Sequence, residues 1–347
     1  METPANGAEA AALLAEAAEA GRTVRARGGA TKWAWGGAAD PDVVLSTERL
    51  GGIEHVAGDL TAVLGAGVRL ADAQAVFAEA GQRLALDPPL GPGEAATVGG
   101  VLAAGDSGPL RHRYGAARDL LLGATVALPD GTVAKAGSRV IKNVAGYDLA
   151  KLYAGSLGSL GVLVEAVVRL HPRPVATATL VGETGDPAAL AHAVQALAAA
   201  PLELEALDVR WAGGSGAVLS QAGGTSAAER ASAAGDLAGI DARVEEDDAA
   251  LWSAQRDAQR PAEGELVRIS GLLDELEATI RAVDAAGGSL VSRAGVTWAS
   301  VPAGAEITGW RVHERWPEPA APLARLAGRV KERFDPAGVL APGVAAA

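Results

Sequence analysis

The sequence predicts an α+β protein of two lobes, and three observations lead to this fold class. The chain has 347 residues, which is enough for two domains that each bury a core. Fourteen glycines stand among apolar runs between Gly91 and Gly161, and after Pro174 the pattern changes to repeated strand and helix units. We expect a first domain over residues 1–174, a cap domain of antiparallel sheet with helices over 175–318, and a C-terminal segment over 319–347 that returns to the first domain.

Composition excludes several classes of function. The formal net charge of −12 argues against sequence-independent binding to nucleic acid, which needs cations to compensate the phosphates. The chain has no cysteine, which excludes disulfides, thiolate nucleophiles and cysteine-ligated iron–sulfur clusters. Its five histidines lack the spacing of metal ligands, so we expect no metal site. If the protein handles electrons, an organic cofactor carries them.

The first domain is predicted to alternate short strands with short helices. A helix over 9–20 ends at Gly21. The strand-like runs are 23–27, 43–46, 53–57, 60–65, 121–128, 132–135 and 162–170. Further helices are expected over 70–80, from Thr97 onward and over 148–153. The glycine-rich stretches fall between these elements, where backbone can approach a ligand closely.

Two glycine-rich turns of this domain are the candidate ligand contacts. The first, Gly28 to Lys32, follows a strand, and its N–H groups could face a pyrophosphate, although an ordinary glycine turn explains the same residues. The second, Thr97 to Gly100, opens a helix whose free N–H groups would suit an anion. A Rossmann-type fingerprint at Gly65 and Gly67 fails, because Leu70 stands where its third glycine would fall.

The cap domain is predicted from a different pattern, in which longer strands and helices follow one another. The expected strands are 176–181, 204–211, 217–220, 265–270, 289–293 and 296–300. The expected helices are 187–199, 226–237 and 272–285, and a last helix over 322–334 follows in the C-terminal segment. This order suits an antiparallel sheet with helices on one face.

Six stretches of the chain resemble flavoproteins of the p-cresol methylhydroxylase (PCMH) and vanillyl-alcohol oxidase type, and among these the smaller FAD-binding subunits of bacterial glycolate oxidases. The stretches are Arg27–Lys32, Ala96–Val101, Ser107–Pro109, Lys142–Asp148, Ala154–Val162 and Phe334–Gly338. The resemblance covers Val24 to Pro174 well, the C-terminus partly and the cap domain loosely. It implies a two-lobed PCMH-type FAD-binding domain followed by an α+β cap domain.

The resemblance also implies which residues hold the cofactor FAD. They are Arg27, Gly28, Gly29, Ala30, Thr31, Lys32, Pro88, Thr97, Val98, Gly99, Gly100, Ala104, Ser107, Gly108, Arg118, Asp119, Gly158, Gly161 and Val162. The two glycine-rich turns would flank the pyrophosphate, Ser107 and Gly108 would lie beside the ribityl chain or the ring, and the Val162 backbone would meet the adenine. Arg118 and Asp119 have an equal alternative as an ion pair that closes a loop.

Three departures from the family pattern qualify this expectation. The first glycine loop lacks the histidine through which some relatives attach FAD, so the resemblance implies non-covalent FAD. Ala341 stands where relatives often carry the asparagine of an Asn-Pro-Gly sequence. The clustered histidines of the larger catalytic subunits are absent from the sequence.

The implied function is that of an FAD-dependent oxidoreductase subunit in a complex that oxidises glycolate or a related 2-hydroxy acid. A larger FAD-containing catalytic subunit and an iron–sulfur subunit are the implied partners, and this flavin would pass electrons on to them. We expect a cytoplasmic protein, held at the inner membrane only through those partners, because the sequence has no secretory signal and no spanning segment. Two alternatives stay open: a non-catalytic FAD-containing assembly subunit, and a self-contained FAD-dependent oxidase of another alcohol.

The catalytic residues stay unassigned from the sequence. Oxidation of a 2-hydroxy acid needs a hydride acceptor, a base for the hydroxyl proton and a cation for the carboxylate. No histidine stands out as the base. Arg268, Arg293 and Arg311 are candidates for the cation, although arginines of such a domain more often form ion pairs.

Overall fold

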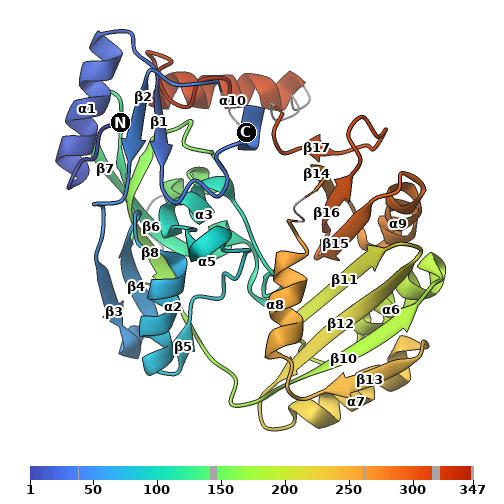
Figure 1. The fold of residues 1–347 in the computed structure, drawn as a ribbon. Coiled ribbons are helices and arrows are strands. Elements are labelled where there is room, and N and C mark those ends of the chain that lie inside the picture. The colour runs from blue at the N-terminus through green and yellow to red at the C-terminus, as the bar shows by residue number, and fades with distance from the viewer. Residues whose placement is uncertain (38, 141–146, 261–262, 315–320, 345–347) are drawn as a thin grey trace.

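The computed structural model describes residues 1–37, 39–140, 147–260, 263–314 and 321–344, and its elements gather around two main sheets (Figure 1). The first lobe begins with α1 (Gly7–Glu19) and a parallel pair of strands, β1 (Val24–Arg27) and β2 (Val43–Ser46). Its main sheet is antiparallel, in the order β3 (Ile53–Val56), β4 (Thr61–Gly65), β8 (Val162–Arg169), β6 (Leu121–Ala127) and β7 (Val133–Gly137).

Short elements fill the connections of the first lobe. They are α2 (Leu70–Glu79), α3 (Val98–Ala104), α4 (Arg111–Tyr114), α5 (Ala117–Leu120), the antiparallel strands β5 (Gln82–Arg83) and β9 (His171–Pro172), and the 3-10 turns η1 (Trp35–Gly37), η2 (Ala57–Asp59), η3 (Pro92–Glu94) and η4 (Leu149–Leu152). Phe77 of α2, Leu102 of α3 and Val168 of β8 are fully buried in one core. This packing fixes α3 on the sheet and sets the position of the Thr97 end of the helix.

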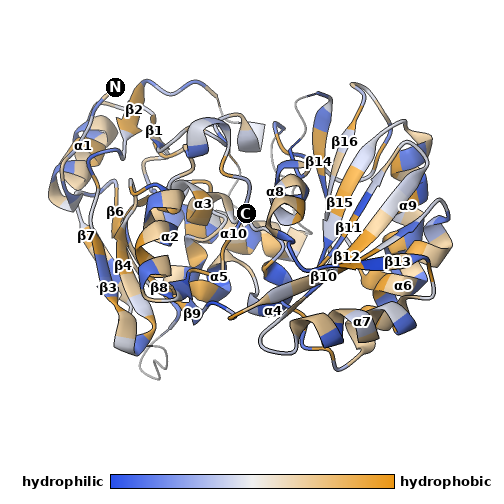
Figure 2. Ribbon diagram, turned by 60° about the horizontal axis from the view of Figure 1, so that its bottom comes forward, coloured by the Kyte–Doolittle hydropathy of each residue, from blue (hydrophilic) through white to orange (hydrophobic). Residues whose placement is uncertain are grey.

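The second lobe is an eight-stranded sheet in which every pairing is antiparallel. Its order is β13 (Ala242–Glu245), β10 (Thr177–Thr184), β12 (Ser215–Gly223), β11 (Ala206–Ala212), β15 (Ser289–Arg293), β16 (Val296–Val301), β14 (Glu265–Ser270) and β17 (Trp310–Arg311). The α+β prediction is therefore confirmed. Figure 2 shows apolar colour along the strands of both lobes.

The helices of the second lobe lie on both faces of its sheet. One face is covered by α6 (Pro187–Ala199), α7 (Ala227–Ala238) and α9 (Leu276–Ala285), with the 3-10 turn η5 (Leu273–Glu275) leading into α9. The alternation along β11 explains this, because Leu207 and Val209 join the core under these helices whereas Asp208 faces the other way. On that other face lies α8 (Ala249–Asp257), a helix that the sequence patterns did not predict, and Figure 1 shows it between the two lobes.

The C-terminal segment lies against the first lobe. After α10 (Ala321–Phe334), the Val24 N–H of β1 donates to Val339 O at 2.8 Å, and the Ala341 N–H donates to Val24 O at the same distance. Because β9 ends at Pro172 and β10 begins at Thr177, we propose the domain boundary at residue 174, with the second boundary near residue 318. Among the described helices, none combines the length and apolarity needed to cross a bilayer.

Candidate functional site

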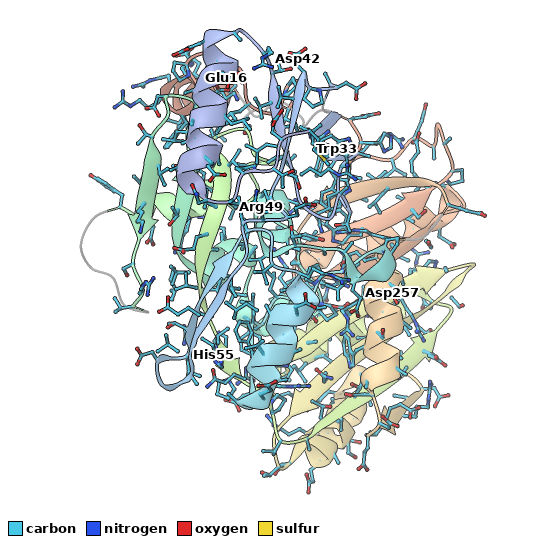
Figure 3. All side chains as sticks on the ribbon, turned by 60° about the vertical axis from the view of Figure 1, so that its left-hand side comes forward. Glu16, Trp33, Asp42, Arg49, His55 and Asp257 are labelled. Carbon is cyan, nitrogen blue, oxygen red and sulfur yellow. The ribbon has the colours of Figure 1, made fainter. Side chains whose placement is uncertain are left out.

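A cavity of about 80 Å³ lies where the loop after β1 meets the first turn of α3. Its lining residues are Arg25, Ala26, Arg27, Gly28, Gly29, Ala30, Thr31, Lys32, Trp33, Thr97, Gly100, Ala103, Ala104 and Leu157. Figure 3 places Trp33 on the side of the first lobe that faces the cap domain. Two glycine-rich stretches from distant parts of the sequence therefore meet at one place.

The loop after β1 carries a row of unused backbone donors. Within the described part of the chain, none of the five N–H groups from Gly28 to Lys32 donates to a protein acceptor. The next N–H groups do have acceptors, since those of Trp33 and Trp35 donate to Ala30 O at 3.1 Å and Lys32 O at 3.0 Å. Ala30 has a left-handed φ of 56°, which turns successive N–H groups toward one another. A concave row of this kind binds anions.

The start of α3 offers fewer donors than the sequence suggested. The Val98 N–H donates to Val68 O at 2.8 Å and the Gly99 N–H to Ala66 O at 2.9 Å. The Gly100 N–H donates to the Thr97 side chain, Oγ1, at 3.2 Å, which is an ordinary helix cap. The expectation of free N–H groups at this helix is therefore wrong, because neighbouring backbone and the cap already use them.

The glycines of the two stretches serve mainly to bring protein segments together. A Cβ on Gly28 would lie 2.1 Å from Thr97 Oγ1, and one on Gly29 would lie 1.6 Å from Ala95 O. A Cβ on Gly99 would lie 2.7 Å from the Ala66 Cβ. Side chains at these positions would collide with protein rather than project into the cavity, which corrects the interpretation of this glycine density as room for a ligand alone.

Three charged side chains gather beside the cavity. Lys32 Nζ lies 3.4 Å from Asp106 Oδ2, and Arg260 of the cap domain forms an ion pair with the same oxygen. Burial alone would raise the pKa of Asp106, but Arg260 and Lys32 outweigh it and hold that pKa below its usual value. Burial lowers the pKa of Lys32 to about 8, although Asp106 acts in the opposite direction. The two cations against one carboxylate leave the cavity wall positive near neutral pH.

Arg25 holds the loop in its curved shape. Its guanidinium donates to the carbonyl oxygens of Trp33 and of Trp35, the latter at 3.4 Å. It also stacks over the Trp33 ring, with 4.1 Å from Cζ to the ring centroid. Since Arg25 is buried on β1, these contacts tie the far end of the loop to the strand that begins it.

Three tryptophans join the same loop to the cap domain. The Trp35 ring lies 5.3 Å from Trp298 of β16 and 6.2 Å from Trp310 of β17, between ring centroids. The Arg260 guanidinium lies 4.8 Å from the Trp35 centroid, so the cation that pairs with Asp106 also contacts this cluster. The cluster packs against Ala104 and Leu157, which line the cavity, so it lies behind one part of the cavity wall.

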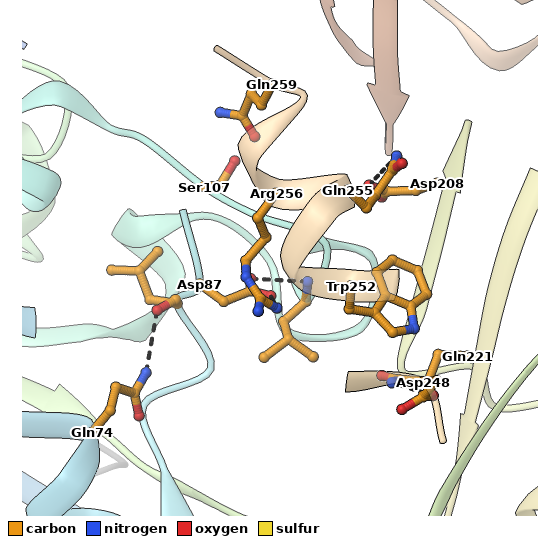
Figure 4. Close-up of polar contacts among 12 residues, drawn as sticks. Gln74, Asp87, Ser107, Asp208, Gln221, Asp248, Trp252, Gln255, Arg256 and Gln259 are labelled. Carbon is orange, nitrogen blue, oxygen red and sulfur yellow. Dashed lines mark hydrogen bonds and ion pairs between the residues drawn. The ribbon is translucent and has the colours of Figure 1, made fainter. Parts of the chain in front are cut away.

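A buried polar network continues from Asp106 into the cap domain around α8. Figure 4 shows its members Gln259, Gln255 and Asp208. Gln259 Nε2 donates to Asp106 Oδ1 at 3.1 Å, and the side-chain oxygen of Gln259, Oε1, accepts from Arg293. Arg293 forms a two-pronged ion pair with Asp208, at 2.7 Å for the closest atoms, and both side chains are fully buried. Gln255 of α8 completes the pair by donating to Asp208 at 3.1 Å. The relative position of the two lobes therefore rests on charged, desolvated contacts.

The structure divides the predicted site residues into two groups. Arg27 to Lys32, Thr97, Gly100 and Ala104 line the cavity together. The others do not line it: Pro88, Val98, Gly99, Ser107, Gly108, Arg118, Asp119, Gly158, Gly161 and Val162. Within this second group, Ser107 is buried beside Asp106, and Val162 is buried in β8 opposite Ala127.

The alternative of an ion pair between Arg118 and Asp119 has no support in the described residues. Both side chains are exposed on α5, and Asp119 instead accepts the Ala116 N–H at 2.8 Å, which caps the helix. Most of the resembling stretch Lys142–Asp148, namely residues 142–146, lies outside the described residues. Asp148 occupies the N-cap of η4, but its side chain pairs with Lys151 at 3.0 Å rather than with the backbone.

Sequence reasoning missed four residues that shape the site: Asp106, Gln259, Arg260 and Trp35. Asp106 directly precedes Ser107 in a glycine-rich stretch, so its position next to a predicted site residue could have identified it. Gln259 and Arg260 follow α8, and no local pattern ties them to a residue over 150 positions away.

All three candidate arginines for a substrate carboxylate already interact with other residues. Arg293 pairs with Asp208, and Arg311 pairs with Glu265, as the ion-pair alternative expected. Arg268 stacks over Trp298, with 5.5 Å from Cζ to the ring centroid. No group of three or more potential metal ligands occurs among the described residues.

Comparison with known proteins supplies the context for this geometry. The sequence profile described as "FAD binding domain" matches residues 2–137. The glycolate oxidase subunit GlcE of Escherichia coli K12 is 32% identical over 301 residues, which cover 80% of this chain and 79% of that protein. The D-lactate dehydrogenase of Archaeoglobus fulgidus is 37% identical over 172 residues, or 49% of this chain, and the aligned part spans 38% of that enzyme's length.

A solved structure extends the likeness to the whole fold. An alkyldihydroxyacetonephosphate synthase superposes with a TM-score of 0.71, covering 98% of this chain and 76% of that chain. The sequences are 15% identical, so this likeness shows the fold alone.

Proposed function

The chain belongs to the family of FAD-binding oxidoreductases that includes the glycolate oxidase subunit GlcE, and from this premise we propose that it is a flavin subunit of a complex that oxidises a small 2-hydroxy acid. Glycolate is the favoured substrate of that complex, because the relative that aligns along most of both chains is named for glycolate. The cofactor itself, FAD, follows from family membership.

The observation that carries the proposal is the row of five unused N–H groups from Gly28 to Lys32 beside a positive cavity wall. The cavity of about 80 Å³ has room for a phosphate group but not for a whole dinucleotide. We infer that this loop holds the pyrophosphate of FAD, with Lys32 as its cation, and that the remaining parts of FAD extend from the cavity past Ala104. When bound, FAD supplies the reversible acceptance of two electrons.

The residues around the cavity would perform three tasks for the cofactor. The Gly28 to Lys32 backbone binds the phosphate charge, and Arg25 keeps that backbone curved. Asp106 orients Lys32 while it holds Arg260 across the lobe interface. The cluster of Trp35, Trp298 and Trp310 would support the part of the cavity wall formed by Ala104 and Leu157. None of these groups requires a covalent bond to FAD, and the loop has no histidine, so we propose that FAD is dissociable.

We further propose that a larger FAD-containing subunit oxidises the substrate and that this chain passes electrons onward to an iron–sulfur subunit. The neutralisation of Arg293 by Asp208 and of Arg311 by Glu265 supports this division of labour, since a substrate carboxylate would have to displace a buried partner at either cation. In this proposal the complex stays cytoplasmic and reaches the inner membrane through the partner subunits.

Two measurements test the proposal. Acid precipitation of the purified protein should release flavin into the supernatant, whereas covalent attachment would leave it in the pellet. Anaerobic addition of glycolate should leave the flavin spectrum of the isolated chain oxidised and should bleach it once the partner subunits are added. Rapid bleaching of the isolated chain would overturn the division of labour, and a protein purified without flavin that takes up none would overturn the site.

A further inference from the structure

A second and larger cavity lies inside the cap domain, between its sheet and two of its helices. It measures about 250 Å³. Most of its lining is contributed by α6, α9, β11, β15 and the turns around them: Val194, Ala198, Leu207, Val209, Ile269, Gly271, Leu272, Leu273, Leu276, Thr279, Ser292, Arg293, Ala294, Gly295 and Thr297, together with His112 of α4. It shares no lining residue with the cavity beside Lys32, and we call it the cap pocket.

The size of the cap pocket exceeds what loose packing produces. Protein cores contain few voids larger than a water molecule, and an apolar cavity of about 150 Å³ already binds benzene. The walls here are aliphatic, with Leu207, Val209 and Leu276 almost fully buried. The exposed side chains of Leu272 and Leu273 also line the pocket, so it opens to solvent at the turn before α9. An apolar molecule the size of a substituted ring can enter and fill it.

One group of polar atoms gives the cap pocket a chemical preference. Ser292 and Thr297 face each other across β15 and β16, and their hydroxyl oxygens lie 2.8 Å apart. Two hydroxyl protons serve this single hydrogen bond, so one proton has no acceptor among the described residues. The pair is nearly buried, and a buried donor without an acceptor is costly.

His112 adds a second polar contact from the first lobe. Its ring makes no hydrogen bond to any residue that the structure describes, although it lines the pocket. Burial lowers the pKa of His112, against the opposing effect of Asp208, so the ring is neutral near pH 7 and can both donate and accept. The remaining polar side chains of the lining already have partners, since Arg293 is held by Asp208 and the Thr279 hydroxyl donates to Glu275 O at 3.0 Å.

We propose that the cap pocket binds an uncharged small molecule that has an apolar ring or chain and one hydroxyl or carbonyl group. The apolar part lies against Leu207, Val209 and Leu276, and the oxygen accepts the spare hydroxyl proton of the Ser292 and Thr297 pair. A carboxylate is disfavoured because Asp208 neutralises Arg293, the only cation among the described lining residues, which leaves a second negative charge without a counter-ion in an apolar site. The site is distinct from the proposed flavin cavity, and the inference does not depend on the flavin.

The test compares three ring molecules of nearly equal shape, benzyl alcohol, toluene and benzoate, by ligand-observed NMR on the full chain as purified. We expect benzyl alcohol to bind about fivefold more tightly than toluene, which is the effect of one net hydrogen bond, and benzoate to bind more weakly than both. Benzoate binding as tightly as benzyl alcohol would contradict the proposal, and so would the absence of binding by all three.

Variants locate the binding. The double change Ser292→Ala and Thr297→Val should remove the preference for benzyl alcohol over toluene while toluene still binds. Val209→Phe should weaken the binding of both, because the larger ring takes up part of the pocket against which the apolar part of the ligand would lie. Ser220→Ala is the matched control, since Ser220 is a fully buried serine of the same sheet that does not line the pocket. An unchanged preference in the double variant, or unchanged binding in Val209→Phe, would place the ligand elsewhere and overturn the proposal.

Discussion

Lys32 Nζ lies 3.4 Å from a carboxylate oxygen of Asp106, and both side chains are almost fully buried. Burial lowers the pKa of Lys32 to about 8, whereas Asp106 is held ionised by two cations. The folded pKa of Lys32 lies below the ordinary value of 10.5, so between pH 8 and 10.5 the unfolded chain binds the extra proton. The deprotonated Lys32 therefore adds to the unfolding free energy as pH rises through that window. A phosphate ligand, in contrast, requires the protonated ammonium form of Lys32.

The first prediction follows from that opposition. The affinity of the apo-protein for FAD should fall as pH rises above about 8, by up to tenfold per pH unit, because binding must then take up a proton. Lys32→Met should bind FAD roughly tenfold or more weakly at pH 7 and should lose the pH dependence, since a charge-assisted contact is removed. Titrations of apo-protein that follow the quenching of FAD fluorescence between pH 7 and 9.5 measure both effects.

Lys135→Met is the matched control, because Lys135 is exposed on β7 and lines none of the cavities described above. It should leave the FAD affinity and its pH profile unchanged. Equal profiles for the parent protein and Lys32→Met would mean that Lys32 does not contact the phosphates.

The second prediction concerns the close contact of the glycine loop with the start of α3. Gly29→Ala places a Cβ 1.6 Å from Ala95 O, and a backbone atom cannot move aside as a flexible side chain can. We expect a loss of about 3 kcal/mol or more in unfolding free energy, together with a loss of bound flavin. Denaturant unfolding and the flavin-to-protein absorbance ratio measure the two quantities.

Gly58→Ala serves as the control for Gly29→Ala. Gly58 is exposed, and a Cβ there would have no neighbouring atom within 4 Å. This variant should keep its flavin and lie within about 0.5 kcal/mol of the parent. If Gly29→Ala behaved in the same way, the loop would not be packed against Ala95.

The third prediction tests the buried ion pair of Arg293 and Asp208 at the lobe interface. Arg293→Met leaves Asp208 as an uncompensated buried charge and should lower the unfolding free energy by about 3–5 kcal/mol. The double variant with Asp208→Leu removes both charges and should recover most of that loss. The exposed pair of Arg281 and Glu277 provides the contrast, and Arg281→Met should change stability by less than about 0.5 kcal/mol. Urea unfolding of the four proteins decides whether the stability of the protein depends on this buried charge pair.

The order of strands and helices could be predicted because most elements bury one face. The helix over Pro187–Ala199 and the strand over Glu265–Ser270 occur with the expected bounds, since each shows the period of its own type between clear breakers. The helix α8 was missed because only Trp252 and Gln255 are buried on it and, apart from Leu251, the rest of its sequence is polar or alanine. Asp248 at its N-cap was the one local signal.

The site could be predicted only where local sequence determines it. The loop from Gly28 to Lys32 has its donors in consecutive backbone, so the glycine motif was enough to predict a candidate row of N–H groups there. The contacts that position it come from distant elements: Asp106 pairs with Arg260, and Trp35 packs on Trp298. Such pairs depend on how the two sheets pack against each other. Neither the charge pattern nor the hydrophobic periodicity of a single sequence predicts that packing.

The last prediction concerns Asp87, which faces Arg256 of α8 at 3.9 Å and accepts the Leu110 N–H at 3.1 Å. Burial raises the pKa of Asp87 from 3.8 to about 6. Between pH 3.8 and 6 the folded protein therefore binds more protons than the unfolded chain. The stability that this group adds at low pH is lost as pH rises through 6. Asp87→Asn cannot ionise, so its stability relative to the parent should improve between pH 4 and 7, by at most about 3 kcal/mol. Because 16% of the side chain is exposed, the change should be smaller than this ceiling. Urea unfolding at pH 4 and pH 7 measures the unfolding free energies. Asp257→Asn is the control, because Asp257 is exposed. If the unfolding free energies of the parent and Asp87→Asn differed by the same amount at both pH values, the raised pKa would be contradicted.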